Sequence, residues 1–262
     1  MAAGILDSRA KEIGMNNRWL IGCSGFHYKD WKGVFYPEKL PQSKWFSHYC
    51  TRFNTLELNS TFYRFPTLAV LQNWHQKSPE AFTFSVKAPR LITHYKQFRD
   101  CAALLHDFYS TTGAGLREKL GAVLFQLPGK IIYSEETLQR ILQSLDPDFT
   151  NVVEFRHSSW WTPQVYEQMA ARAVIFCGVS HPQLPDDMIQ NNPIIYYRFH
   201  GVPRLYYDEY DSKIIKDMSS RLKNNLQLKR AYIYFNNTAG MGAIHNAEQL
   251  ISAMGISDKI IV

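Results

Sequence analysis

Charged side chains interrupt several short apolar runs of this sequence and supply the groups that an acid–base or anion-binding site needs. They are Glu57, Lys87, Glu154, Arg156, Arg198 and His200. Two carboxylates therefore face three permanent cations, and the histidine could add a fourth. Because planar guanidinium groups suit phosphate and carboxylate, we expect the arginines and the lysine to hold a small anionic ligand. One of the glutamates would act as general base and His200 as proton donor.

The spacing of these residues places them on one face of each run, because side chains alternate along a strand. In the run from Thr55, Glu57, Asn59 and Thr61 share the face opposite two leucines. The runs from Asn151 and Ile194 repeat this alternation. Comparable late positions in the other runs are held by Lys87, Gln126 and Asn236.

The apolar runs themselves predict eight strands, since they are rich in β-branched and aromatic residues. They begin at Trp19, Thr55, Phe82, Gly121, Asn151, Ala173, Ile194 and Ala231. Between most of them lie segments with apolar residues three or four apart, which predict helices. These segments are 44–53, 68–77, 134–145, 164–173, 212–226 and 243–254. Strands that alternate with helices predict a parallel sheet with right-handed crossovers.

Eight such units predict a single (β/α)8 TIM-type barrel over residues 19–262, after a flexible leader over residues 1–18. The segment GCSGFHY is not a GxGxxG loop, which disfavours an open dinucleotide-binding sheet. Pro182, Pro185 and Pro193 predict that helix six is short or missing. Helices cover the outside of a barrel, so the polar faces must point inward and converge at its C-terminal mouth. The competing interpretation is a purely structural ion-pair network.

Composition narrows the class of protein. The chain of 262 residues is 45% hydrophobic and 20% charged, as in globular proteins. Its net charge of +6 favours anionic partners without specifying a nucleic acid. The apolar runs are too short to span a bilayer and the first residues lack the apolar core of a signal peptide. We therefore expect a soluble, cytoplasmic protein with no membrane partner and with four reduced cysteines; the oligomeric state stays open.

The whole chain from Trp19 onward resembles the YecE-like family, a domain of unknown function. The matching blocks are IGCSGFHYKDWKGVFYP, FNTLELNSTFYRFP, FTFSVKAP, LFQLP, VVEFRHSSWW, YYRFHG and YIYFNNTAGMGAIHNAEQL. Seven blocks in order make the resemblance specific, although the family usually has Gly-Trp where this chain has Gly25 and Phe26. The resemblance implies a TIM-type barrel and no particular reaction.

Several residues after the strands extend the expected site. Tyr28 and Trp31 lie in a long loop after the first strand, where they could stack on a ligand ring or plug the barrel. Asn236 and Asn237 follow the last strand, ahead of two glycines and a helix whose free N–H groups could hold an anion. We expect Asn59, Gln126, Arg156, Arg198, Asn236, Asn237, Tyr28 and Trp31 to bind the substrate, and Glu57, Lys87, Glu154 and His200 to act on it.

The residues leave several chemistries open. Glycoside hydrolysis is disfavoured because the cations would keep both glutamates ionised. We expect no metal, although Glu57, Glu154 and His200 could bind a single divalent ion. Lys87 could form a Schiff base if its pKa were lowered, but an ion pair with a glutamate is the favoured interpretation.

These considerations lead to three hypotheses of function. The first is binding, with hydrolysis or isomerisation by general acid–base catalysis without an organic cofactor, of a phosphorylated or carboxylated small molecule. The second is a nucleic-acid-binding protein or phosphodiesterase that uses the basic mouth and the aromatic loop. The third is a non-catalytic scaffold.

Overall fold

A computed structural model of the protein describes residues 18–256, and the strands within that range are all parallel. Apart from Arg18, the expected leader lies outside the described residues. The strands are β1 (Trp19–Cys23), β2 (Thr55–Leu58), β3 (Thr83–Lys87), β4 (Leu120–Gln126), β5 (Asn151–Glu154), β6 (Ile175–Ser180), β7 (Ile194–Phe199) and β8 (Arg230–Phe235). Each lies within or beside one of the runs expected to form a strand, so the sequence pattern located all eight.

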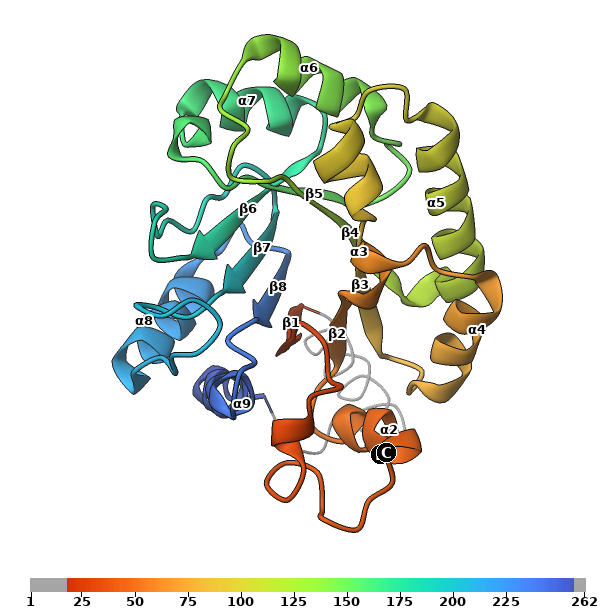
Figure 1. Ribbon diagram of the computed structural model, residues 1–262. Coiled ribbons are helices and arrows are strands. Elements are labelled where there is room, and N and C mark those ends of the chain that lie inside the picture. The colour runs from red at the N-terminus through yellow and green to blue at the C-terminus, as the bar shows by residue number, and fades with distance from the viewer. Residues whose placement is uncertain (1–17, 257–262) are drawn as a thin grey trace, which may run out of the picture.

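The strands form a nearly closed barrel of the TIM type, which confirms the expected fold. Their order is β1-β8-β7-β6-β5-β4-β3-β2, so sequential strands are neighbours and β1 and β2 meet at the seam. Figure 1 looks along the barrel and shows the helices as an outer ring around the strands. The polar residues late on the strands therefore converge at one end of the barrel.

Helices follow most of the strands. They are α2 (Trp45–Cys50), α3 (Ser60–Tyr63), α4 (Leu68–Lys77), α5 (Ala102–Leu116), α6 (Glu135–Ser144), α7 (Pro163–Ala171), α8 (Ser212–Asn224) and α9 (Gly242–Met254). Shorter helical turns are η1 (Lys29–Trp31), η2 (Gln42–Lys44), η3 (Leu91–Lys96), η4 (Arg117–Lys119) and η5 (Ser158–Trp160). No helix among residues 18–256 is long and apolar enough to cross a membrane.

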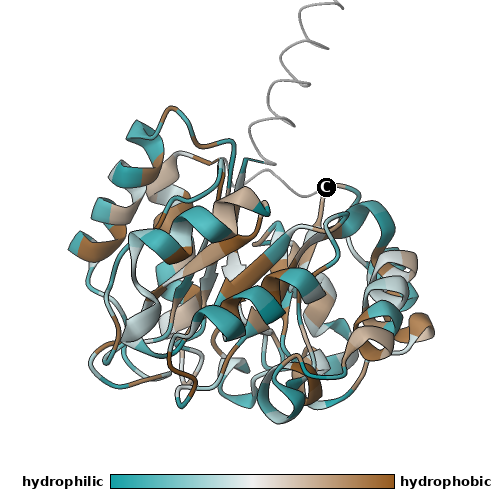
Figure 2. Ribbon diagram, turned by 90° about the horizontal axis from the view of Figure 1, so that it is seen from above, coloured by the Kyte–Doolittle hydropathy of each residue, from teal (hydrophilic) through white to brown (hydrophobic). Residues whose placement is uncertain are grey.

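The hydrophobic core has two layers, because the two faces of each strand meet different neighbours. Ile195, Tyr197 and Phe199 on β7 pack outward in the large cluster shared with the helices, whereas Tyr196 faces the smaller cluster inside the barrel. Figure 2 shows brown hydrophobic segments along the strands and on the helix sides that meet them. The alternation expected for this strand is therefore observed, with Tyr196, Arg198 and His200 on the inner side.

The connection between β6 and β7 lies entirely within the described residues and contains no helix. The helix that would follow the sixth strand is therefore missing, as expected. Asn191 holds this connection in place: its Oδ1 accepts from Phe176 N at 3.0 Å and its Nδ2 donates to Val174 O at 2.9 Å.

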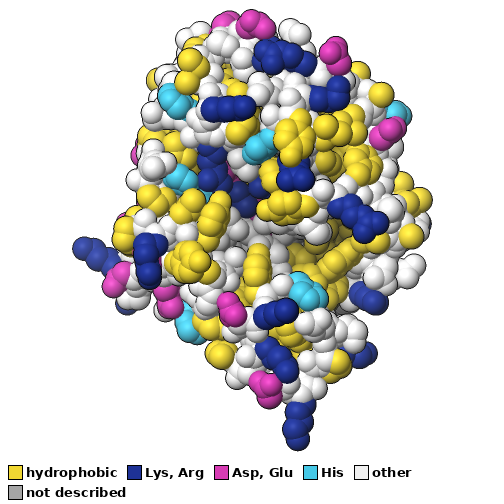
Figure 3. Space-filling model, in the orientation of Figure 1, with side chains coloured by type: hydrophobic (Ala, Val, Ile, Leu, Met, Phe, Trp, Pro, Cys, Tyr) yellow, Lys and Arg dark blue, Asp and Glu magenta, His cyan; other side chains and the backbone are white. Residues whose placement is uncertain are grey.

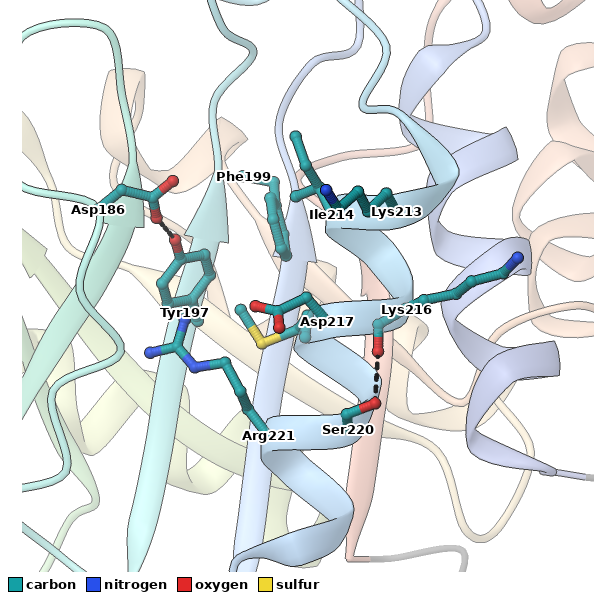
Figure 4. A pocket seen from close by; sticks show the side chains of 10 residues that line it. Asp186, Tyr197, Phe199, Lys213, Ile214, Lys216, Asp217, Ser220 and Arg221 are labelled. Carbon is teal, nitrogen blue, oxygen red and sulfur yellow. Dashed lines mark hydrogen bonds between the residues drawn. The ribbon is translucent and has the colours of Figure 1, made fainter.

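Outside the barrel wall, a pocket of about 670 Å³ lies between β7 and α8. Figure 4 shows Asp186 and Tyr197 on one side of this pocket, joined by a hydrogen bond, and residues of α8 on the other.

At the seam between β1 and β2, the backbone pairing is a single β-bridge between Ser24 and Glu57. Side chains add further hydrogen bonds there. The Tyr49 hydroxyl accepts from Cys23 N at 2.8 Å and donates to Thr55 O at 3.0 Å. A Cβ at Gly22 would lie 2.3 Å from Thr55 O and 2.8 Å from that hydroxyl. The bridging hydroxyl therefore requires glycine at this position.

Replacing Gly22 with alanine is expected to destabilise the protein by about 1–3 kcal/mol, because the added methyl group overlaps backbone at the seam. Urea unfolding measures the change. The matched control is Gly113→Ala in α5, whose Cβ would meet the Phe149 ring at an ordinary 3.4 Å and whose helical position favours alanine. Equal stabilities of the two variants would contradict this account of the seam.

Candidate functional site

Arg198 lies at the centre of the barrel mouth and joins two carboxylates from opposite strands. Its Nη2 donates to Glu57 Oε1 at 2.6 Å and its Nη1 donates to Glu154 Oε2 at 2.6 Å. All three side chains are buried. Taking charges out of water is unfavourable unless they are paired and hydrogen-bonded. The arginine therefore neutralises both carboxylates. Each of its two terminal nitrogens is used in one of these ion pairs.

The remaining carboxylate oxygens also have partners. Glu57 Oε2 accepts from the Tyr196 hydroxyl at 2.6 Å. Glu154 Oε1 accepts from Arg156 Nε and lies 3.3 Å from His200 Nε2. Burial opposes ionisation of Glu154, but the two arginines outweigh it and hold the pKa of this carboxyl well below its usual range. Glu154 is thus a weak base, contrary to the role expected from the sequence.

His200 is neutral at physiological pH. Burial and then the neighbouring Arg156 lower its pKa well below the usual value. Asn236 Nδ2 lies 2.9 Å from Nδ1, and Glu154 Oε1 and Arg156 Nη2 lie 3.3 and 3.1 Å from Nε2. The side chain is fully buried, so it contributes to the frame around Glu154 and is a poor proton donor in this state.

Arg156 retains a donor that faces the mouth. Its Nε pairs with Glu154 and its Nη2 lies 3.1 Å from His200 Nε2. Its Nη1 makes no hydrogen bond to any described residue, and 12% of the side chain is exposed. A guanidinium held on one edge and open on the other can meet an incoming phosphate or carboxylate.

Lys87, the last residue of β3, has no anionic partner. Its Nζ lies 4.1 Å from the centre of the Phe62 ring, and within residues 18–256 it forms neither a hydrogen bond nor an ion pair. Burial, followed by the charge of Arg198, lowers its pKa to about 7. The ion pair with Glu57 or Glu154 that the sequence favoured is therefore not formed, because Arg198 occupies the carboxylate oxygens on this side.

Asn59 lies beside Lys87, but not on a strand as expected. β2 ends at Leu58, where the chain turns into α3, and the Thr61 hydroxyl donates to Leu58 O and Lys87 O. Leu58 pairs with Val86, and Asn59 and Lys87 are the residues that follow this last pair. Asn59 Oδ1 is buried without a hydrogen-bond partner among the described residues.

The loop after β1 is a plug. Trp31 is fully buried, donates from Nε1 to Gly240 O at 2.8 Å and packs against Tyr28 at 4.8 Å between ring centres. The Tyr28 hydroxyl donates to Ser24 O at 2.6 Å. The ring and the N–H of Trp31 are both occupied by the protein, which favours a plug over a contact with substrate.

Two more of the residues expected to bind substrate form hydrogen bonds within the protein. Asn237 is buried, and its Nδ2 donates to Asp208 O at 3.0 Å and to Asn246 Oδ1 at 3.1 Å, which fastens the loop after β8. Gln126 ends β4 and donates to Leu127 O at 2.6 Å. The structure thus gathers Glu57, Glu154, Arg156, Arg198, His200 and Asn236 into one network at the mouth, with Lys87 and Asn59 at its edge.

Exposed aromatic residues form a rim that the sequence reasoning did not identify. Tyr63, Tyr95 and Tyr207 are 70%, 66% and 63% exposed, and they follow β2, β3 and β7. Arg90 lies 5.7 Å from the Tyr63 ring and 5.5 Å from the Tyr95 ring, and Arg204 lies 5.9 Å from the Tyr207 ring. The sequence signal that could have identified these tyrosines is their position in the segments that follow strands. Figure 3 shows dark-blue Lys and Arg side chains in a hollow near the centre of this face, with yellow hydrophobic side chains around it.

The donor set at the mouth does not fit a divalent metal. Two of the residues that could have bound a single ion, Glu57 and Glu154, are separated by the Arg198 guanidinium, which bonds to both. Throughout the part of the chain that the structure describes, no three His, Cys, Asp or Glu side chains are grouped to hold a metal ion. The buried carboxylates therefore form ion pairs with arginine side chains.

A family model described as "Protein of unknown function DUF72" matches residues 20–261. The chain belongs to the DUF72 family. This confirms the YecE-like resemblance. UPF0759 protein YunF of Bacillus subtilis is 26% identical over 90% of this chain and 94% of its own length. UPF0759 protein YecE of Escherichia coli is 31% identical over 50% of this chain and 48% of its own length.

Solved structures of DUF72 proteins share the barrel. The crystal structure of a DUF72 family protein from Thermotoga maritima aligns with a TM-score of 0.82 at 27% identity, covering 90% of this chain and 99% of that one. A DUF72 family protein from Enterococcus faecalis aligns with a TM-score of 0.78 at 20% identity, over 91% of this chain and 96% of that one. The family's description assigns it no function, so the function has to be argued from the mouth itself.

Proposed function

We propose that the mouth of this DUF72 barrel binds a small phosphorylated or carboxylated molecule, with Arg156 and Lys87 contacting the anionic group. The proposal rests on a difference between the cations: some are paired with carboxylates and others have donors without an acceptor. Arg198 is committed to two carboxylates, whereas Arg156 Nη1 and Lys87 Nζ have no hydrogen-bond acceptor among the described residues. Open donors of positive charge in a hollow favour an anion.

The charge balance at the mouth supports this assignment. The two carboxylates are neutralised by Arg198 and Arg156, so Lys87 is the group whose charge responds to a ligand. A bound anion raises the pKa of Lys87, because opposite charge favours the ammonium form. By linkage, the anion binds more tightly as pH falls through the Lys87 pKa of about 7.

Any reaction at this site would use Lys87 to exchange the proton, since its pKa lies near neutral. Glu57, Glu154 and His200, first expected in that role, would instead hold Arg156 in place through the network described above. The reaction class that fits is hydrolysis or isomerisation by general acid–base catalysis, without an organic cofactor. Asn59, whose buried Oδ1 is unpaired within residues 18–256, would orient a hydroxyl or amide of the substrate.

A thermal-shift panel tests the proposal. Phosphorylated sugars, nucleotides and small carboxylates are screened against sodium chloride at equal ionic strength. At about 100 times its dissociation constant, a true ligand adds roughly 2.7 kcal/mol of stability, and we expect at least one anion class to give a shift of this order. A panel in which no anion exceeds the salt control would contradict the proposal and favour a non-catalytic scaffold.

A nucleic acid is the second candidate, favoured by the rim of exposed tyrosines with arginines stacked on them. Single strands bind by stacking bases on such rings beside positive charge. Salt separates the two candidates, because nucleic-acid affinity falls log-linearly and steeply with salt concentration. A small ligand that contacts two cations would respond weakly. Oligonucleotides therefore belong in the same panel, at two salt concentrations.

A further inference from the structure

We propose that Lys87 captures the carbonyl group of an aldehyde or ketone that also carries an anionic group, and forms an imine with it. The inference rests on the proposed function, because Arg156 would hold the anionic group while Lys87 reacts. It narrows the substrate class from small anions to anionic carbonyl compounds such as oxo acids and phosphorylated aldehydes or ketones.

The surroundings of Lys87 differ from those of a structural lysine in the same protein. Lys119 Nζ donates to His75 O at 2.7 Å, to Ser78 O at 2.9 Å and to Ser78 Oγ at 2.9 Å, so its ammonium is fully satisfied. Lys87 Nζ instead lies over the Phe62 ring and has no acceptor among the described residues. An ammonium without acceptors readily gives up its proton, which yields the nucleophilic amine.

The charged groups that face Lys87 keep a large part of it in the amine form. Burial, followed by the charges of Arg198 and Arg156, lowers its pKa to about 7, while Glu154 and Glu57 partly oppose this shift. His94, on η3, faces the same group, and its own pKa is lowered to about 4 by burial and then by Lys87. Relative to a lysine at the usual 10.5, the amine fraction at neutral pH is larger by roughly a thousandfold.

Asn59 provides a neighbouring acceptor for the covalent adduct. It occupies the position beside Lys87 along the paired ends of β2 and β3, and its Oδ1 is buried without a partner in the described part of the chain. An unsatisfied buried acceptor is unfavourable until a donor arrives. The hydroxyl of a carbinolamine, or the N–H of an iminium, would supply that donor.

The step is balanced without an oxidant or reductant. The Nζ lone pair attacks the carbonyl carbon, the C–N bond forms, and the carbonyl π electrons move to oxygen, which takes a proton. The nitrogen loses one proton to give a neutral carbinolamine. Protonation of the hydroxyl then expels water and leaves the C=N bond of the iminium. One proton passes from nitrogen to oxygen, and the second proton, which makes the hydroxyl leave as water, comes from solvent.

Reductive trapping with glyoxylate, a small anionic aldehyde, tests the inference. The protein is incubated with glyoxylate and cyanoborohydride, digested, and mapped by mass spectrometry. We expect Lys87 to be modified at least tenfold faster than Lys119 or the exposed lysines at pH 7. With glyoxylate well below saturation, the rate at Lys87 should rise with pH and level off above about pH 7, the pKa of Lys87 in the unliganded protein. Equal labelling of all exposed lysines with Lys87 unmodified would overturn the inference.

Variants separate failure of the inference from failure of the proposed function. Lys87→Met should lose the preferred adduct, and Arg156→Gln should slow its formation while leaving the amine in place. Wild-type mapping does not depend on whether either variant folds. If anions stabilise the protein but glyoxylate leaves Lys87 unmodified, the inference fails and the anion site stands. If neither occurs, both fail.

Discussion

Replacing Arg198 with methionine is expected to destabilise the protein by about 3–5 kcal/mol, the range found when one member of a buried ion pair is removed. The guanidinium is the shared partner of Glu57 and Glu154, and all three side chains are buried. Its removal leaves two carboxylates in a low-dielectric interior with reduced compensation. Urea unfolding at neutral pH measures the loss.

The pH dependence of this loss follows from the direction of the pKa shifts. In the wild type the pKa of Glu154 is depressed, so its contribution is present above the unfolded pKa and is lost as pH falls through the folded value. In the variant, Glu154 loses one of the two arginines that hold its pKa down, so this contribution to stability becomes smaller. The difference between the two proteins should be largest at neutral pH and should narrow in acid.

A charge-matched variant controls for lost packing. Combining Arg198→Met with Glu57→Gln removes the carboxylate whose only ionic partner among the described residues is Arg198, and it leaves Glu154 paired with Arg156. This variant should recover part of the stability, because replacing a buried ionic group as a whole is far less unfavourable than breaking it. A double variant no more stable than the single one would show that charge is not what makes Arg198 important.

Replacing Trp31 with alanine is expected to destabilise the protein by about 3–5 kcal/mol, as is usual for a buried tryptophan. The ring is fully buried, packs against Tyr28 and Tyr36, and donates to Gly240 O. The replacement therefore loosens both the loop after β1 and the loop after β8. Thermal and urea unfolding check the magnitude.

Trp31→Phe distinguishes a plug from a ligand contact. Phenylalanine keeps most of the packing and loses the hydrogen bond to Gly240, whose net contribution is about 1 kcal/mol. If Trp31 is a plug, this variant binds an anion from the panel as tightly as the wild type does. A stable Phe variant with strongly weakened anion binding would restore Trp31 to the binding site and contradict its assignment here.

Strand positions and inward-facing polar residues could be predicted because both follow from local patterns. Alternation placed Glu57, Glu154 and Arg198 on the inner faces, and in a barrel these faces meet. The longest helix, α5, was not among the expected segments. Its sequence AALLHDFYSTTGAGL contains a run of Ser, Thr and Gly that are weak helix formers. Packing against the barrel overrides that weak propensity.

Partner choice within the site could not be predicted from the sequence. The polar pattern did not show that Arg198 would take both carboxylates and leave Lys87 without a partner, because this depends on how deep each side chain lies in the barrel. Trp31 was ambiguous because its acceptor, Gly240 O, is 209 residues away along the chain. Asn59 was misplaced because the β-rich string NSTFY forms a helical turn as soon as β2 ends.

Calorimetric titration of the wild type and of Arg156→Gln would show whether the barrel mouth binds the anion that gives the largest thermal shift. The guanidinium of Arg52 is exposed and pairs with Glu248, so Arg52→Gln is the matched control. We predict that Arg156→Gln weakens binding at least tenfold, or about 1.4 kcal/mol, whereas Arg52→Gln binds like the wild type. Equal affinity of all three proteins would contradict an anion site at the barrel mouth.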